Sequence, residues 1–326
     1  MSVEILCLRP RADFERAEAL PPDSLDVMYR APGDDDVPAL MRKAKALVIP
    51  AVGPKLPPDL FEGSSLQLIQ VTGAGMDRLD AATLKRLGIP AANVPGGSNS
   101  AVAEYVVTSA LVLLRRLAWA DDEIRRGNYA SFRARMLADN LAGLDGLLIG
   151  VVGLGSIGLA VAEVFKKMGC RIRYFDPAPR DAAAADALCA SSLTLDELLK
   201  TADVVTLHVP LLPETQGFMG DRELTLMKTG AVLIQASRGG IVDETALARH
   251  LESGHLGGAA IDVYSAEPPA ADHPLLALQG EAAHRVLFTP HIAGVTRQSA
   301  AYLFRAAWKN VERVAVAGEP PLNRVY

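Results

Sequence analysis

The chain has 326 residues, of which 50% are hydrophobic and 22% are charged, and its formal net charge is -5. This length suggests about two domains, and the composition is typical of a folded globular protein rather than a disordered one. A negative net charge gives no basic footprint for nucleic acid. The longest apolar stretch, Tyr105 to Leu114, is shorter than the roughly 20 residues of a membrane-spanning helix. We therefore expect neither a nucleic-acid partner nor a membrane.

The cysteines and the first residues of the chain indicate its compartment. Cys7, Cys170 and Cys189 have no paired spacing, so we expect neither a disulfide framework nor a zinc site, and no metal. The opening residues, Met1 to Pro10, read as a strand and lack the cationic and apolar regions of a signal peptide. The sequence therefore predicts a cytoplasmic protein.

The first hundred residues alternate short apolar runs with helical patterns, which predicts a parallel sheet in an α/β domain. The expected strands are Val3 to Leu8, Ala46 to Ile49 and Leu66 to Val71, and the expected helices are Asp36 to Ala44 and Ala81 to Leu87. Val102 to Arg126 then reads as one long helical stretch, which Gly127 would end.

A second α/β series begins at Leu147. Its apolar runs are nearly continuous, as a sheet covered on both faces requires. The expected strands are Leu147 to Val152, Arg171 to Phe175, Val204 to Val209, Ala231 to Gln235, Ala259 to Val263 and Val286 to Thr289. Helices are expected at Ile157 to Met168, Asp243 to Ser253 and Thr296 to Ala317, and the last could pack back on the first domain. We therefore expect a discontinuous first domain, residues 1–101 and 292–326, with residues 102–291 inserted as a second domain.

The glycines of Gly153-Leu-Gly155-Ser-Ile-Gly158 follow a predicted strand and open a helix. Such a loop lets the backbone approach a pyrophosphate, which the amides and the positive dipole end of the helix then bind. Asp176 lies 18 residues beyond Gly158 and ends the next strand, close to the spacing at which a carboxylate binds the adenosine ribose. The pattern predicts a dinucleotide site.

Asp176 also bears on the choice of cofactor. A carboxylate accepts hydrogen bonds from ribose hydroxyls and repels a 2′-phosphate, so NAD is expected in preference to NADP. Arg180, four residues further on, could soften this preference.

Three polar residues follow strands of the second series, where open α/β sheets bind their ligands. They are Arg238, Glu267 and His291. A guanidinium holds a carboxylate bidentately, an imidazolium with a reference pKa of about 6.5 donates protons near neutrality, and a paired glutamate favours the charged ring. Each residue alone could belong to an ordinary turn. Together they suit the reduction of a 2-oxo acid.

The sequence resembles the D-isomer-specific 2-hydroxyacid dehydrogenase family over almost its whole length. The motifs that carry the resemblance are Gly73-Ala-Gly75-Met-Asp77-Arg-Leu-Asp80, Asn93-Val-Pro with Val102-Ala-Glu104, Gly153-Leu-Gly-Ser-Ile-Gly158, Leu207-His208-Val-Pro210-Leu, Ser237-Arg238-Gly239-Gly240 with Val242-Asp243-Glu, Gly258-Ala-Ala-Ile-Asp262-Val, Glu267-Pro and Thr289-Pro-His291. The resemblance implies a Rossmann NAD-binding domain inserted in a flavodoxin-like substrate domain, both doubly wound around parallel sheets.

The resemblance also implies the site residues. Arg238, Glu267 and His291 would be catalytic, and Ala74 and Gly75, with Arg238 and His291, would bind the substrate. Asp262 would lie by the nicotinamide, and His208 would flank the dinucleotide without proton chemistry. The expected cofactor contacts are Gly153, Gly155, Ser156, Ile157, Gly158, Asp176, Val209, Pro210, Ser237, Asp262, His291 and Gly294.

The expected activity is hydride transfer between NADH and a small 2-oxo or D-2-hydroxy acid such as glyoxylate, hydroxypyruvate or pyruvate. By analogy with the family, Ala51, Val52 and Met76 would lie near the substrate side chain and suggest a small or apolar group, whereas Arg297 could favour an anionic one. Relatives that act on phosphoglycerate carry arginines where this chain has Pro50 and Val71, which disfavours that substrate. An alternative is a redox-sensing binding protein like the corepressors that share this scaffold.

A homodimer is the expected assembly. The segment Val102 to Gly146 combines an apolar helix with an arm, Asn128 to Met136, whose scattered apolar residues need a partner surface. Relatives dimerise through this region in a two-fold contact.

Overall fold

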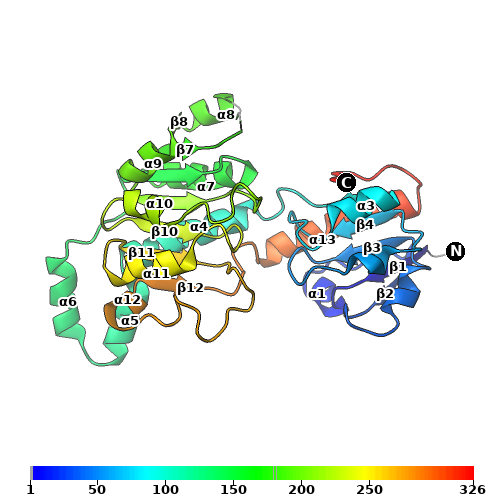
Figure 1. Ribbon diagram of the computed structural model, residues 1–326, viewed down its shortest axis with the longest axis horizontal. Helices are drawn as coiled ribbons and strands as arrows, with labels where there is room; N and C mark the ends of the chain where they lie inside the picture. The colour runs from blue at the N-terminus through cyan, green and yellow to red at the C-terminus, as the bar shows by residue number, and fades with distance from the viewer. Residues whose placement is uncertain (1–2, 179, 181) are drawn as a thin grey trace. The chain divides into compact units, whose positions relative to one another are not determined.

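The computed structural model describes residues 3–178, 180 and 182–326, and its chain divides into two compact units. The first unit comprises Met1–Ser98 and Val295–Tyr326, and the second comprises Asn99–Gly294. Each unit is a parallel β-sheet with helices on both faces (Figure 1). The expected fold class, two parallel-sheet α/β domains, is confirmed.

The first unit has the strand order β2-β1-β3-β4-β5, which is the flavodoxin-like order. Alternate strand residues point to opposite faces, so Leu6 packs with the helices α2, η1 and α3, and Ile5 packs with α1 and α13. The elements are β1 (Val3–Cys7), α1 (Arg11–Arg16), β2 (Leu25–Tyr29), α2 (Val37–Met41), β3 (Ala46–Ile49), η1 (Pro58–Phe61), β4 (Leu68–Val71), α3 (Ala81–Leu87), β5 (Ala91–Ala92) and α13 (Arg297–Ala315).

Helix α13 joins this unit although it follows the second unit in sequence. Thr296 caps its first turn by accepting a hydrogen bond from the Ser299 amide at 3.1 Å. Its buried Asn310 donates to Oε1 of Gln70 on β4 at 2.6 Å, so a buried polar pair fixes the helix on the sheet. The helix therefore completes one face of the first unit's core.

The second unit has the strand order β12-β11-β10-β9-β6-β7-β8. Counted from β6, this is the 3-2-1-4-5-6 order of dinucleotide-binding folds with one more strand, β12, at the edge. The strands are β6 (Leu148–Val152), β7 (Arg171–Phe175), β8 (Ser191–Ser192), β9 (Val204–Leu207), β10 (Val232–Gln235), β11 (Gly258–Ile261) and β12 (Val286–Phe288). The helices are α4 (Asn99–Leu114), α5 (Leu117–Arg125), α6 (Tyr129–Ala138), α7 (Ser156–Lys167), α8 (Ala182–Ala187), α9 (Leu195–Thr201), α10 (Asp221–Leu226), α11 (Glu244–Glu252) and α12 (Gly280–Ala283).

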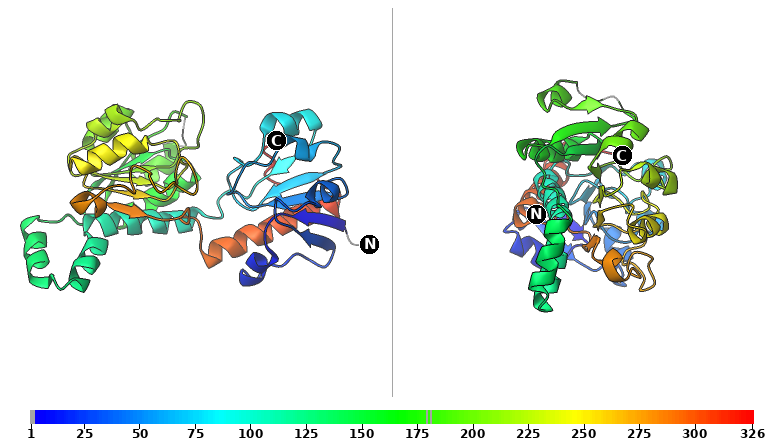
Figure 2. Two further views of the ribbon diagram at one scale, coloured as in Figure 1. Left: turned by 60° about the horizontal axis from the view of Figure 1, so that its bottom comes forward. Right: turned by 90° about the vertical axis from the view of Figure 1, so that its left-hand side faces the viewer.

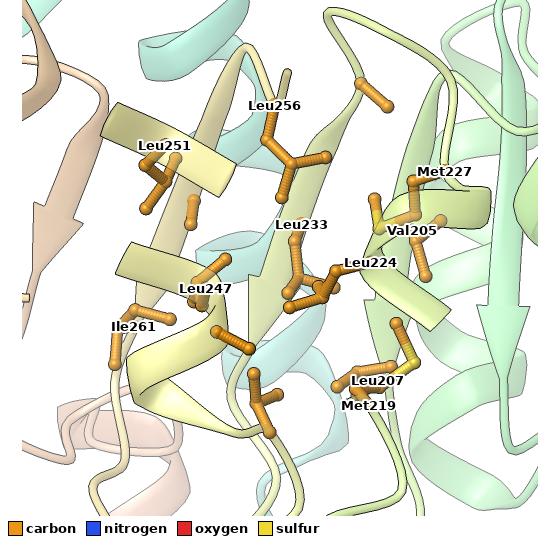
Figure 3. Close-up of a cluster of buried hydrophobic side chains, with 14 of the residues drawn as sticks. Val205, Leu207, Met219, Leu224, Met227, Leu233, Leu247, Leu251, Leu256 and Ile261 are labelled. Atoms are coloured by element: carbon orange, nitrogen blue, oxygen red, sulfur yellow. The ribbon is translucent and has the colours of Figure 1, made fainter. Parts of the chain in front are cut away.

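Two apolar cores cover the faces of this sheet. On one face, side chains from β9, β10 and β11 meet those of α9, α10 and α11, as Figure 3 shows for Leu233, Leu224 and Leu247. On the other face, α4 and α7 cover the sheet through residues such as Val106 and Phe165. Because both faces are buried, the strands are nearly continuous apolar runs, and their carboxyl ends share one edge of the sheet.

One predicted helix is wrong. The stretch from Val102 to Arg126 was expected to be a single helix, but it breaks into α4 and α5. Arg116 adopts a left-handed backbone (φ 50°), which ends α4 and turns the chain. The turned chain lets Trp119 meet Phe132 of α6 edge-on at 5.4 Å, so α5 and α6 form a hairpin that extends from the unit (Figures 1 and 2).

Within the described part of the chain, no helix combines the length and apolar character needed to cross a bilayer.

Candidate active site

Arg238, Glu267 and His291 lie on three loops that leave the same edge of the second unit's sheet. The loops follow β10, β11 and β12, which are neighbours in the sheet. Parallel strands bring their carboxyl ends to one edge, so sequence positions more than 50 residues apart share one site.

Glu267 and His291 form a hydrogen-bonded pair. Nδ1 of His291 lies 2.8 Å from Oε2 of Glu267, and the other carboxylate oxygen accepts the Tyr264 amide proton at 3.1 Å. Both side chains keep partial exposure, 23% for His291 and 31% for Glu267. Because the pair uses Nδ1, Nε2 is the ring nitrogen that remains for proton exchange with a ligand.

The buried carboxylate of Asp262 anchors the backbone around His291. Its two oxygens accept the amides of Ile292 and Ala293, each at 2.8 Å, and its carbonyl accepts the His291 amide at 2.8 Å. Asp262 is fully buried. His291 itself has φ 56°, an uncommon backbone for a residue with a side chain. The structure thus places Asp262 behind the histidine loop.

The loops of Arg238 and Glu267 are locked together by a close backbone approach. A Cβ on Gly239 would lie 1.7 Å from the carbonyl oxygen of Tyr264, so only glycine fits there. Arg238 is also held locally, since its Nη1 donates to the Ser237 carbonyl at 2.7 Å and Gln235 donates to the Arg238 carbonyl at 2.8 Å. These contacts fix where the guanidinium emerges from the sheet edge.

The glycine loop has the geometry of a dinucleotide cradle. Gly153 has φ 92°, and a Cβ there would lie 2.7 Å from the His208 carbonyl oxygen. A Cβ on Gly158 would lie 2.1 Å from the Gly153 carbonyl oxygen, whereas one on Gly155 would meet nothing within 4 Å. The space over Gly155 is open, and no described side chain caps the first turn of α7, whose residues Ser156 and Ile157 begin the helix. The loop therefore fits the pyrophosphate of NAD.

Asp176 is at the end of β7 and is already engaged. Its carboxylate accepts the Leu154 amide at 2.7 Å and the Ala178 amide at 3.0 Å. Arg180 donates two further hydrogen bonds to it, of 2.6 and 3.0 Å. Burial alone would raise the pKa of Asp176, but these donors lower it. The carboxyl side chain is only 2% exposed, so a ribose would share it with Arg180 or displace that arginine.

His208 lies next to the glycine loop and is kept neutral. Burial lowers its pKa to about 4, and its Nε2 bonds to the Thr206 hydroxyl at 2.9 Å. With this pKa the ring carries no proton to donate near pH 7.

The remaining predicted cofactor and substrate contacts differ in their exposure. Val209 is buried, Pro210 is exposed, and Ser237 and Gly294 are half-buried in the second unit. Ala74 and Gly75 belong to the first unit, in the loop after β4, where Asn93 donates to the Ala74 carbonyl at 2.7 Å.

Known proteins resemble this chain. The family model described as "D-isomer specific 2-hydroxyacid dehydrogenase, NAD binding domain" matches residues 107–293. The glyoxylate reductase of Aeropyrum pernix is 33% identical over 264 residues, which cover 80% of this chain and 77% of that protein.

Two further comparisons agree. The D-3-phosphoglycerate dehydrogenase of Archaeoglobus fulgidus is 35% identical over 72% of this chain, and the match spans 42% of that longer protein. A solved structure of a D-lactate dehydrogenase from Treponema pallidum superposes with a TM-score of 0.81 at 26% identity, covering 99% of each chain. The chain belongs to the family of D-isomer specific 2-hydroxyacid dehydrogenases, which are oxidoreductases, and its second unit contains their NAD-binding domain.

Proposed function

We propose that this protein transfers a hydride between NADH and C2 of a small 2-oxo acid, forming a D-2-hydroxy acid, and that it also catalyses the reverse reaction. The observation that carries the proposal is the 2.8 Å contact between His291 and Glu267 at the sheet edge that also carries Arg238. This arrangement supplies an acid/base group and a cation on neighbouring loops.

Arg238 is the proposed anchor for the substrate carboxylate. A guanidinium presents two parallel N–H donors that match the two carboxylate oxygens. The loop that bears it is fixed by Gln235 and by the contact of Gly239 with Tyr264. The amides of Ala74 and Gly75, in the first unit, are proposed to bind the substrate. The first unit, with the tail of the chain, is accordingly the proposed substrate-binding domain.

His291 is the proposed proton donor and acceptor. In reduction, Nε2 gives its proton to the oxygen on C2 as negative charge develops there, and in oxidation it takes that proton back. Glu267 holds Nδ1 throughout, which orients the ring and stabilises its charged form.

The cofactor supplies or accepts the hydride when it is bound. The chain's part is to hold it through the open backbone at Gly155, the first turn of α7 and Asp176. Ser237, Val209, Pro210, Asp262 and Gly294 are proposed as the remaining lining.

The substrate is proposed to carry a small or apolar group, because Ala51 and Val52 follow β3 and Met76 follows β4 at the ligand-binding edge of the first unit. NADH oxidation measured with glyoxylate, hydroxypyruvate, pyruvate and longer 2-oxo acids tests the proposal. Turnover of at least one acid is expected. No turnover with any acid would contradict the proposal and favour the redox-sensing binding protein considered above.

Asp176→Ala is expected to weaken NADH binding and to narrow the preference for NADH over NADPH. The carboxylate should accept one or two charge-assisted hydrogen bonds from ribose hydroxyls, of roughly 1.5–3 kcal/mol each. Arg180→Ala removes the cation from this carboxylate and is expected to weaken NADPH binding relative to NADH binding. Fluorescence titration with each cofactor measures both effects, and an unchanged Kd for NADH in Asp176→Ala would show that the carboxylate does not contact the cofactor.

The protein is proposed to be a homodimer built through residues 102–146. The hairpin of α5 and α6 exposes Tyr129 and Leu137 by 65% each, and Leu117 by 50%, an unusual density of uncovered apolar side chains. Light scattering at micromolar concentration should give the mass of two chains, and Leu137→Asp should shift the mass toward one chain. A monomeric mass for the unmodified protein would refute the proposal.

A further inference from the structure

Behind the loop of His291, three side chains form a directed chain of hydrogen bonds. The hydroxyl of Tyr105, on α4, lies 2.7 Å from Oγ1 of Thr289, which donates to Oδ1 of Asp262 at 2.6 Å. A threonine hydroxyl has one proton. Since that proton goes to the carboxylate, Tyr105 must be the donor to Thr289. Burial raises the pKa of Tyr105, so the phenol keeps the proton that it donates.

The receiving carboxylate is the group that shapes the histidine loop. The Asp262 side chain accepts hydrogen bonds from the Thr289 hydroxyl and from the amides of Ile292 and Ala293. Its backbone carbonyl accepts the His291 amide. A fully buried carboxylate needs such donors to stay in place. The left-handed backbone of His291 likewise persists only where its surroundings hold it.

The backbone of Thr289 is held by its own hydrogen bonds, which do not involve its side chain. The Thr289 carbonyl is held by the hydroxyl of Tyr264 at 3.0 Å, and the Thr289 amide is bonded to the Ile261 carbonyl at 3.0 Å. Removing the Thr289 hydroxyl therefore leaves residue 289 in position and breaks its two side-chain links, to Tyr105 and to Asp262. The residues that gain freedom are those that Asp262 restrains, His291 to Ala293.

We propose that Tyr105 and Thr289 are positioning residues for His291, acting through Asp262 to hold the imidazole where proton transfer to the substrate can occur. The network joins α4, with which the chain enters the second unit, to the loop just before the chain leaves it. The inference rests on the proposed role of His291.

The test compares Thr289→Val, Thr289→Ser and Tyr105→Phe in the full-length enzyme. Thr289→Val should lower kcat by roughly 10- to 100-fold, because a small displacement of a catalytic group costs rate steeply. Thr289→Ser restores the hydroxyl and should stay close to the unmodified enzyme, and Tyr105→Phe should lose roughly 3- to 10-fold. The Kd for NADH, from fluorescence titration, should not change in any of them.

Tyr29→Phe is the matched control. The Tyr29 hydroxyl is buried and has no hydrogen-bond partner in the described part of the chain, so its removal should leave kcat unchanged. A role in stability alone would lower Tm without changing kcat measured well below Tm.

Double variants decide whether the residues act as one unit. Tyr105→Phe combined with Thr289→Val should be no slower than Thr289→Val alone, and Thr289→Val should cause no further loss in His291→Ala. Full kcat in Thr289→Val, multiplying losses in the double variant, or a further loss in His291→Ala would each overturn the proposal.

If Thr289→Val does not accumulate as folded protein, Tyr105→Phe and its combination with His291→Ala carry the same test. A His291→Ala enzyme that keeps full activity would overturn the proposed function and this inference together. A slow His291→Ala enzyme beside fully active Thr289→Val and Tyr105→Phe enzymes would overturn the inference alone.

Discussion

Replacing His291 by alanine is expected to lower kcat for 2-oxo acid reduction by roughly 10² to 10⁴-fold. The variant loses the proton donor for the developing alkoxide, and water must supply the proton instead. The Kd for NADH should stay nearly unchanged, because the glycine loop and Asp176 follow other strands, β6 and β7. Steady-state kinetics with the best substrate and fluorescence titration with NADH measure the two quantities.

His250→Ala is the control for this variant. His250 is on α11, where its Nε2 lies 3.2 Å from Asp221, and it has no proposed part in the chemistry. The control should keep the kcat of the unmodified enzyme. Equal activities of the His291 and His250 variants would remove His291 from the mechanism.

Arg238→Lys is expected to raise KM for the 2-oxo acid by roughly 10- to 100-fold, with a smaller effect on kcat. An ammonium group keeps the charge but cannot reproduce the bidentate fork, and each charge-assisted bond contributes roughly 1.5–3 kcal/mol. Arg249→Lys, which alters an exposed pair with Asp221, is the matched control. An unchanged KM in Arg238→Lys would mean that another group binds the carboxylate.

Much of the fold could be predicted from apolar periodicity alone. The bounds of β3 (Ala46–Ile49) and β7 (Arg171–Phe175) agree with the prediction. Lys45 and Pro50 flank the first run, and Asp176 follows the second. The strand predicted as Val204 to Val209 ends instead at Leu207. The prediction ran too long because Val209 is apolar and stays buried after the chain has left the sheet. Burial, rather than strand pairing, sets the length of an apolar run.

Two features that the sequence did not reveal lack an apolar signal. β8 consists of two exposed serines at a sheet edge and has no buried face to mark it. The sequence also gave no sign of the helix break at Arg116, because Arg115 and Arg116 are good helix formers. At this left-handed turn Arg116 makes one contact distant in sequence, its pairing with Asp139, and one local contact, with the ring of Trp119.

In the site, the sequence motifs identified the candidate catalytic residues but not the residues that hold them in position. The pairing of Glu267 with His291 could be anticipated, because the two residue types suit one reaction. The link from Tyr105 through Thr289 to Asp262 could not, because a tyrosine in an apolar helix gives no sign of its partner. Only the packing of α4 on β10, β11 and β12 brings the three together. The engagement of Asp176 by Arg180 was likewise only hinted at by the spacing.

The pH dependence of kcat/KM in both directions, for the unmodified enzyme and for Glu267→Gln, tests the central claim most directly. Reduction requires a protonated His291 and should slow as pH rises, whereas oxidation requires the neutral ring and should speed up. Glutamine keeps a hydrogen-bond acceptor near Nδ1 but removes the negative charge that favours the protonated ring, so both profiles should move to lower pH. Burial lowers the pKa of His208 to about 4, so His208 cannot account for a transition near neutrality. Opposite profiles that shift together in Glu267→Gln are the predicted result, and profiles that do not shift would contradict the pairing of Glu267 with His291 as the acid/base unit.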